Sequence, residues 1–377
     1  MDRDIIIIGG GPSGLSTALH LARDFPHLTP RILILEKARY PRLKLCAGGL
    51  VVDAEVILQR LGLNVREVPH VDVDNLHFDF EAKGLNIRMP KSHALRVIRR
   101  DEFDIWLAQK ARDRGIEIRE QTAVRNITAD NHGVTVETDH GDFRAKIVVG
   151  ADGSNGVTRR CVFPSAPVYT ARVLEIITPT RAERSMRSAF FEFSPVPDNI
   201  AGYIWDFPTQ VKGEAMRCWG IYDTNLLASE KRPQLKEPLA QEMSRLGFNL
   251  DDYEIEGHPI RWFSPEQNMS APRILLVGDA VGADPLFGEG ISVALGYGKL
   301  AAREIGSAFQ RNDFSFKRYK RRVLWSSLGQ ALIARWIITY VIYPIKWRWF
   351  QILLWRIMKP VVLFVAWLFV LNWGRRL

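Results

Sequence analysis

Cysteine is scarce in this chain, which has three, Cys46, Cys161 and Cys218, among 377 residues. An odd number without the spacing of metal ligands argues against a disulfide framework and against a zinc centre. We therefore predict no metal site and expect a reducing, cytosolic environment. A signal peptide is not expected either, because the apolar run Ile5–Ile8 predicts a strand very close to the first residue.

Acidic residues are missing from residues 314–377, which hold twelve Lys and Arg. The net charge of +9 comes from this segment, since residues 1–313 keep 39 of the 51 basic residues and all 42 acidic ones, a net charge of −3. Seven of the eleven Trp also lie here: Trp325, Trp336, Trp347, Trp349, Trp355, Trp367 and Trp373. Basic side chains with interfacial indoles predict contact with the cytoplasmic side of a membrane, peripheral or monotopic. Nucleic acid is not expected as a partner, because long aliphatic runs dilute the basic residues.

A long uncharged run is also missing from this segment. The longest, Pro360–Gly374, has 15 residues, fewer than the roughly 20 that a membrane-spanning helix needs. Pro344 and Pro360 divide the segment into about three helices. We expect helices that lie in one leaflet. A tilted span beginning near Val361 and a helical cap on the protein's own core are the alternatives.

Glycine is concentrated in two segments that each follow an apolar run. Residues 9–14 read Gly-Gly-Gly-Pro-Ser-Gly after Ile5–Ile8, and residues 278–290 begin Gly-Asp-Ala-Val-Gly after Ile274–Val277. A strand, a glycine turn and a helix N-terminus present backbone N–H groups and a positive dipole end to anions. Two such segments in one domain predict a long dinucleotide held by both, which would be FAD. No second complete fingerprint follows, so a dedicated NAD(P)H domain is not expected.

The first glycine segment fits the pattern G-x-G-x-x-G with Gly9, Gly11 and Gly14. Glu36 ends the next predicted strand, 22 residues beyond Gly14, where the pattern places an acid for a ribose hydroxyl. An ordinary strand–helix turn with a surface Glu is the alternative.

The whole sequence predicts an α/β (α+β) protein with a Rossmann-like FAD-binding domain, an inserted antiparallel β-sheet domain for the substrate and a C-terminal helical, membrane-associating segment. We assign residues 1–70, 100–160 and 266–310 to the FAD-binding domain. The substrate domain would comprise residues 71–99 and 161–265, and the C-terminal segment residues 311–377. The expected strands are 4–8, 31–35, 76–80, 85–89, 116–119, 134–138 and 143–149. The expected helices are 12–24, 53–61 and one that Asp101 caps and that runs to about Arg114.

Four further motifs accompany the glycine segments: residues 44–50 (KLCAGGL), 100–104 (RDEFD), 149–153 (VGADG) and 203–208 (YIWDFP). With the layout, they resemble the flavoprotein superfamily that includes para-hydroxybenzoate hydroxylase, and within it the geranylgeranyl reductase family. The resemblance covers roughly residues 1–310.

The resemblance implies a role for each matching residue. The loop with Gly9, Gly11, Ser13 and Gly14 would face the FAD pyrophosphate together with Arg100, and Glu36 would bind the ribose. The backbone of Val124 would contact adenine. Asp279 would bind the ribityl chain or the pyrophosphate. The remaining cofactor contacts would come from Cys46, Ala47 and Gly49 along the flavin, and from Gly290 and Ile291 at its N1 edge.

The same resemblance implies a substrate cavity lined by Tyr203, Trp205, Phe207 and Pro208. The Tyr203 hydroxyl or the Cys46 thiol would be the catalytic proton relay. Cys46 as a small buried side chain, and the aromatic residues as ordinary core, are the alternatives.

The implied activity is an FAD-dependent reductase that saturates C=C bonds of a long, geranylgeranyl-type isoprenoid chain by hydride transfer from reduced flavin. An external donor, NADPH or ferredoxin, would supply the electrons. An FAD-dependent monooxygenase or halogenase with a hydrophobic substrate, and a flavoprotein that carries electrons to membrane quinone, are alternatives. Residues 216–221 hold one glycine where the reductases have a glycine-spaced strand, which leaves the substrate open. Residues 278–282 lack the Gly-Asp-Ala-Ala-His of the monooxygenases, which argues against hydroxylation.

Overall fold

The computed structural model describes residues 3–166, 169–227 and 233–377. Its first sheet has eight strands, and five of them run parallel in the order β18-β11-β1-β2-β8. These are β1 (Arg3–Ile8), β2 (Ile32–Leu35), β8 (Glu117–Arg119), β11 (Gly141–Gly150) and β18 (Ile274–Leu276). Three antiparallel strands complete the sheet: β9 (Val124–Ala129), β10 (Val134–Thr138) and β17 (Ser270–Ala271).

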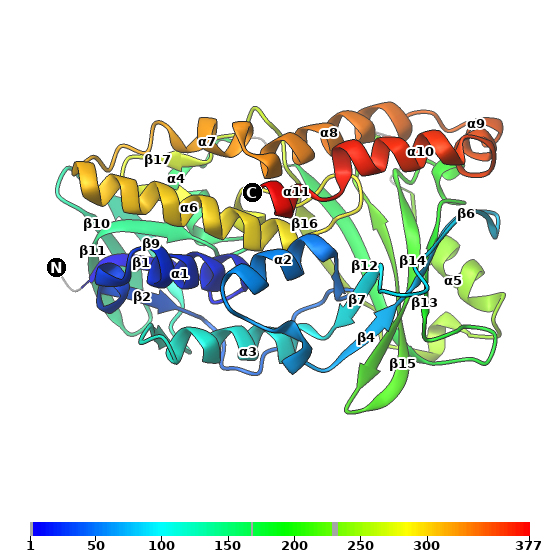
Figure 1. Cartoon of the computed structure of the whole chain (residues 1–377), viewed down its shortest axis with the longest axis horizontal. Helices are drawn as coiled ribbons and strands as arrows, with labels where there is room; N and C mark the ends of the chain where they lie inside the picture. Colours follow the sequence, from blue (N-terminus) through cyan, green and yellow to red (C-terminus); the bar gives the residue numbers. More distant parts are fainter. Residues whose placement is uncertain (1–2, 167–168, 228–232) are drawn as a thin grey trace.

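The apolar runs of the parallel strands are buried on both faces, as parallel strands require. Ile5 and Ile7 belong to the larger core under the helices, whereas Ile6 and Ile8 belong to a smaller core with Val136. The helices around this sheet are α1 (Pro12–Asp24), α2 (Val52–Arg60), α3 (Arg100–Arg112), α4 (Val157–Val162) and α6 (Ile291–Arg311). Figure 1 shows α6 running beside α1. Gly298 permits this approach, because a Cβ there would lie 2.5 Å from the Ser16 Oγ.

The predicted cap of α3 is wrong. Arg99 is the N-cap residue, and the helix begins at Arg100 and ends at Arg112. Asp101 lies inside the first turn, where its carboxylate accepts a hydrogen bond from Arg99 Nε at 3.2 Å. The helix dipole favours a carboxylate in the first turn, so Asp101 does mark the start of this helix. It lies two positions beyond the N-cap residue that it was predicted to be.

The second sheet has seven strands in the order β16-β12-β15-β14-β13-β5-β6. All pairs are antiparallel except β13 with β5, two strands from distant parts of the chain that no hairpin connects. The strands are β5 (Asn75–Phe80), β6 (Lys83–Arg88), β12 (Thr170–Pro179), β13 (Ser188–Glu192), β14 (Gly202–Val211), β15 (Glu214–Asp223) and β16 (Glu256–Arg261). A small third sheet of β3 (Gly49–Leu50), β4 (His70–Val73) and β7 (Leu95–Ile98) lies between the two.

The two faces of the seven-stranded sheet have different cores. Ile204 and Trp219 pack on α5 (Lys236–Ser244) through Leu239 and Met243. The opposite face is aromatic and carries Tyr203, Trp205 and Phe207 on alternate positions of β14. This second face is called the aromatic wall below.

The C-terminal segment lies along one edge of the molecule and crosses both sheets (Figure 1). It consists of α7 (Tyr319–Trp325), α8 (Ser327–Ile342), α9 (Arg348–Ile352), α10 (Lys359–Val365) and α11 (Trp373–Arg376), with π-helical turns after α9 and α10. Breaks occur near both prolines, as predicted, and also at Ser326 and after Val370. In the part of the chain that the structure describes, no single helix has the length and hydropathy of a membrane span. Two consecutive helical stretches together have the length and hydropathy of a span, Arg348–Ile357 and Lys359–Arg376, but the chain bends by 77° between them.

Candidate functional site

The first glycine segment packs backbone against backbone on the end of β11. Gly9 has φ +104°, and a Cβ there would lie 2.3 Å from the carbonyl oxygen of Ala151. A Cβ at Gly14 would lie 2.1 Å from the Gly9 oxygen. Gly11 is different, since the nearest atom to its Cβ position is Arg42 Nη2 at 3.4 Å. The turn is therefore closed toward the protein and open at Gly11, where a ligand could approach the backbone.

Glu36 directly follows β2 and holds the start of this turn. Its carboxylate accepts hydrogen bonds from the backbone N–H of Gly10 at 2.8 Å and of Ala38 at 3.0 Å. The backbone N–H of Thr122 donates to the Glu36 carbonyl at 2.9 Å, which places the start of β9 at Val124 nearby. The predicted ribose and adenine contacts are thus neighbours.

Two arginines share one carboxylate beside the open turn. Arg100 donates to Asp104 through Nε at 2.9 Å and Nη2 at 2.8 Å. Arg42 Nη2 also lies 3.0 Å from Asp104 Oδ2, and Arg42 Nε lies 3.6 Å from the Glu36 carboxylate. Two guanidinium groups near a single buried Asp104 suit a pyrophosphate. Arg100 was predicted; Arg42 was missed, because no motif contains it.

The two glycine segments meet in space, as the sequence predicts. Gly278 has φ +60°, and a Cβ there would lie 2.6 Å from Ser13 Oγ. Gly290 is the N-cap residue of α6, and the nearest atom to its Cβ position is Asp279 Oδ1 at 3.7 Å. Space is therefore open at the N-terminus of α6, where N–H groups and the positive dipole end favour an anion.

Asp279 caps no helix. The turn that contains it has Val277 as its N-cap residue, and α6 has Gly290. Burial raises the pKa of Asp279, and the charges of Lys44 and Arg100 oppose this rise. Within the described residues its carboxylate accepts no hydrogen bond. The carboxylate oxygens of Asp279 are therefore available to accept hydrogen bonds from a ligand.

Residues 44–50 connect this region to the aromatic wall. The backbone N–H of Cys46 donates to Glu175 Oε1 at 3.2 Å, and Gly48 N donates to Cys46 Sγ at 3.4 Å. Burial raises the pKa of the Cys46 thiol, so the thiol stays protonated at neutral pH. A Cβ at Gly49 would lie 3.4 Å from Phe207 Cε2, so backbone and wall are in close contact.

Three tyrosine hydroxyls hold the second glycine segment from the wall side. Tyr203 donates to the carbonyl of Phe287 at 2.6 Å, Tyr222 to that of Pro285 at 3.0 Å and Tyr343 to that of Leu286 at 2.7 Å. Burial raises the pKa of the Tyr203 phenol above its ordinary range. The predicted substrate residues Tyr203, Trp205 and Phe207 come together, but Pro208 does not, because strand alternation turns it to the opposite face.

A residue of the C-terminal segment completes this loop. Arg335 of α8 is 3 % exposed, and its Nη1 lies 2.7 Å from Glu289 and 3.2 Å from Asp284. Its Nη2 donates to the Val370 carbonyl at 2.8 Å. Asp284 in turn accepts from the backbone of Leu286 at 2.7 Å. Arg335 was not predicted, because in the sequence it is one of twelve basic residues after 313 that together predict a surface for headgroups.

The sequence model of the FAD binding domain family matches residues 2–296. The chain belongs to this family. The flavoprotein is an FAD-dependent oxidoreductase, which confirms the predicted cofactor and the α/β FAD-binding fold. The residues around Gly11, Gly290, Arg100 and Asp279 fit FAD, because they leave open space, paired guanidinium groups and a free acceptor where its phosphates and polar chain would need them.

Similar proteins confirm the resemblance to the geranylgeranyl reductases. The menaquinone reductase of Mycolicibacterium smegmatis is 27 % identical over 354 residues, covering 88 % of this chain and 81 % of that protein. Digeranylgeranylglycerophospholipid reductase 1 of Methanopyrus kandleri is 28 % identical over 350 residues, covering 85 % and 86 %. The crystal structure of a geranylgeranyl bacteriochlorophyll reductase-like protein from Thermoplasma acidophilum shares the fold, with a TM-score of 0.80 at 21 % identity, covering 99 % and 97 %.

Proposed function

We propose that this flavoprotein saturates C=C bonds of a long isoprenoid chain carried by a membrane lipid or quinone. The observation that carries the proposal is the aromatic wall, which contacts both Gly49 and the 285–287 backbone beside the open N-terminus of α6. The wall continues away from the site through further aromatic rings, one pair edge-to-face and the next stacked. Phe191 lies 5.0 Å from Phe207, and Phe78 lies 4.6 Å from Phe191, measured between ring centroids. Such a surface suits an extended apolar chain.

Bound FAD, once reduced, would supply the hydride for this reaction. The protein's part is to align the alkene, exclude water and provide a proton. Tyr203 fixes the loop before α6 through Phe287, and Trp205 and Phe207 present apolar faces to the substrate. The external electron donor, NADPH or ferredoxin, remains a prediction.

The C-terminal segment supports a membrane surface as the source of the substrate. One side of it packs on the body through Tyr319, Leu332 and Trp373. The same segment also exposes large apolar side chains: Trp325, Ile337, Tyr340, Val341, Trp347, Trp349, Ile357, Val361, Leu363, Phe364, Trp367, Leu368, Phe369 and Leu371. A surface cavity of about 590 Å³ between Arg318, Arg321, Arg322 and Trp325 suits an anionic headgroup. We therefore propose monotopic attachment on the cytoplasmic side.

The same helices lie over the aromatic wall, which links attachment to substrate entry. Trp355 stacks on Phe193 with a centroid distance of 4.1 Å and lies 6.0 Å from Phe78. Exposed Trp349 is in α9, the helix that leads into Trp355. A prenyl chain leaving the bilayer at α9 and α10 would reach the wall without crossing water.

A triple variant of the exposed side tests attachment. Trp349→Ser, Phe364→Ser and Trp367→Ser together remove rings that are 59–61 % exposed. At roughly 1–2 kcal/mol for each ring transferred to the interface, vesicle partitioning should weaken by at least about 100-fold. Flotation with anionic vesicles measures this. Met89→Ser, at an exposed apolar residue outside the segment, is the control; equal flotation of the triple variant and the control protein would refute attachment. Truncation after residue 313 is unsuitable, because it would leave Asp284 and Glu289 without Arg335.

Mass spectrometry of lipid extracts from host cells with and without the protein tests the activity. We expect prenylated lipids or quinones to gain two hydrogens for each bond reduced, without oxygen. The Gly9→Ala variant, expected not to bind FAD, is the matched control. Oxygen consumption coupled to NAD(P)H oxidation would instead indicate the monooxygenase or halogenase alternative. Flavin turnover with no mass change in any prenyl chain would indicate an electron carrier to quinone.

A further inference from the structure

We infer that Glu175 is the acid that delivers the proton to the alkene, in place of Cys46 or Tyr203. The inference rests on the proposed function and assigns its proton donor. Glu175 belongs to β12 in the seven-stranded sheet and matches no motif of the sequence.

The sheet register places Glu175 on the aromatic wall. It lies opposite Gly220 of β15, which lies opposite Trp205 of β14, so all three positions share one face. Gly220 has no side chain, and a Cβ there would lie 2.1 Å from Cζ2 of Trp205. The indole therefore leans across Gly220 toward β12. Glu175 and Trp205 therefore lie on one face of the sheet, on either side of Gly220.

The carboxyl also contacts the segment that runs along the flavin site. Its Oε1 accepts a hydrogen bond from the backbone N–H of Cys46 at 3.2 Å. Its Oε2 is buried and has no hydrogen-bond partner among the described residues, although Glu175 is only 7 % exposed. A buried, unpartnered carboxyl oxygen is costly unless it is protonated or meets a ligand.

The surroundings bring the pKa of this carboxyl close to neutral pH. Burial raises the pKa of Glu175 to about 7; the N–H of Cys46 opposes the rise, and the neighbouring Glu256 of β16 adds to it. Among the described residues, it is also surrounded by Arg99, Lys44, Cys46 and Cys218, and His258 lies on the same face of β16, two residues beyond Glu256. An acid is most useful when its pKa lies near the working pH.

The two predicted relays are weaker acids in this structure. The Tyr203 hydroxyl already donates to the Phe287 carbonyl, and burial raises its pKa. Burial also raises the pKa of the Cys46 thiol. Glu175 is the group beside the wall whose proton is both available and labile at neutral pH.

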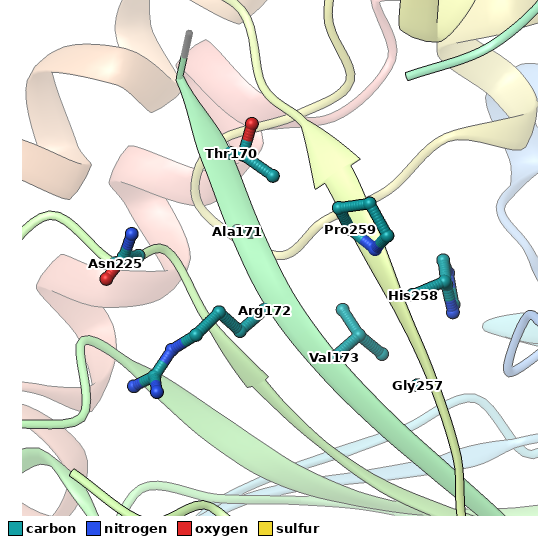
Figure 2. A pocket seen from close by; sticks show the side chains of 8 residues that line it. All are labelled: Thr170, Ala171, Arg172, Val173, Asn225, Gly257, His258 and Pro259. Atoms are coloured by element: carbon teal, nitrogen blue, oxygen red, sulfur yellow. The ribbon is translucent and has the colours of Figure 1, made fainter. Parts of the chain in front are cut away.

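The step balances with reduced flavin as the two-electron donor. The alkene π bond breaks, one carbon gains a hydride from reduced flavin, and the other gains the proton from the Glu175 O–H bond. The carboxylate left behind regains a proton from water. A cavity of about 490 Å³ lies at the edge pair β12 and β16. Its lining includes Val173, Gly257 and His258 (Figure 2). Glu256, directly opposite Glu175, precedes the cavity residue Gly257 in β16.

Anaerobic reoxidation of photoreduced protein by a digeranylgeranylglycerophospholipid in vesicles tests the assignment. The wild-type rate should fall tenfold per pH unit above about pH 7. Glu175→Gln should lower the rate by about 100-fold or more and flatten the profile, and Glu175→Asp should restore part of both. Tyr203→Phe should keep the wild-type profile. Glu256→Gln should move the profile to lower pH, because it removes a negative neighbour. Glu237→Gln, at an exposed residue of α5 on the opposite face of the sheet, should not change it.

A second measurement needs no substrate. Difference infrared spectra of the oxidised holoprotein should contain a protonated-carboxyl band that titrates near pH 7 and disappears in Glu175→Gln, with FAD content unchanged. A Glu175→Gln variant that keeps a pH-dependent wild-type rate, or a band absent from the wild type, would overturn the assignment. If the wild type is not reoxidised by any prenyl lipid while the band titrates as expected, the proposed function has failed and Glu175 loses its role as proton donor with it.

Discussion

Gly9→Ala is expected to abolish FAD binding. The new Cβ would lie 2.3 Å from the carbonyl oxygen of Ala151, and φ at this position is +104°. Backbone on both sides cannot yield, so the turn has to move away from β11 and from Gly14, whose own Cβ position is 2.1 Å from the Gly9 oxygen. We expect a loss of about 2–4 kcal/mol in the free energy of unfolding, from the clash and the left-handed backbone together. FAD affinity should fall by at least about 100-fold, measured by flavin fluorescence titration.

Gly141→Ala is the matched control for this prediction. Gly141 has φ +97°, nearly that of Gly9, but no atom lies within 4 Å of its Cβ position. It should show the cost of the backbone conformation alone, about 1 kcal/mol, and bind FAD normally. If both variants bind FAD equally well, the close approach of the turn to Ala151 does not support the cofactor site.

Arg335→Met is expected to destabilise the protein and release FAD. Arg335 is the buried cation of a cluster with Asp284 and Glu289, and its loss leaves two carboxylates without their partner. Removing one member of a buried pair costs about 3–5 kcal/mol. Because Asp284 orders the backbone of Leu286 and Phe287 before α6, we expect weaker FAD binding as well as a lower unfolding midpoint. Chemical denaturation with and without FAD measures both.

Arg348→Met is the control on the same C-terminal segment. Arg348 bonds Glu81 through two contacts of 2.6 Å, but its side chain is 65 % exposed. Water and salt screen such a pair, so stability and FAD binding should stay at the wild-type level. Equal losses in the two variants would show that burial of the Arg335 cluster does not set its importance.

Local patterns in the sequence were sufficient for the parts of the fold that local chemistry determines. The apolar runs before the two glycine segments form β1 and β18, which both pair in parallel with β11, one on each side of it. Gly278 lies against Ser13, as a dinucleotide site shared by the two segments requires. Glu36 holds the first glycine turn, and Arg100 lies near it on the Asp104 carboxylate, but their contacts with FAD stay predictions. The Asp101 cap failed because helix boundaries depend on backbone geometry that one favourable residue type does not determine.

The parts that could not be predicted depend on contacts between distant residues. The raised pKa of Glu175 comes from its burial, and its position on the aromatic wall comes from the pairing with Gly220. Its hydrogen-bond partner, the backbone of Cys46, is 129 residues away in the sequence. In the sequence, nothing distinguishes Arg335 from the other basic residues of its segment. Only the fold shows that it is buried against Asp284. Pro208 shares a motif with Phe207 but faces the other side of the sheet, because a motif is linear and a strand alternates.

The most direct measurement of the central claim is a crystal structure of the protein with FAD. We predict pyrophosphate density between Gly11, Arg42 and Arg100, and a flavin ring between residues 46–49 and Gly290. One face of that ring should border Trp205 and Glu175. Density that engages one glycine segment alone, or a ring turned away from β14, would contradict the account.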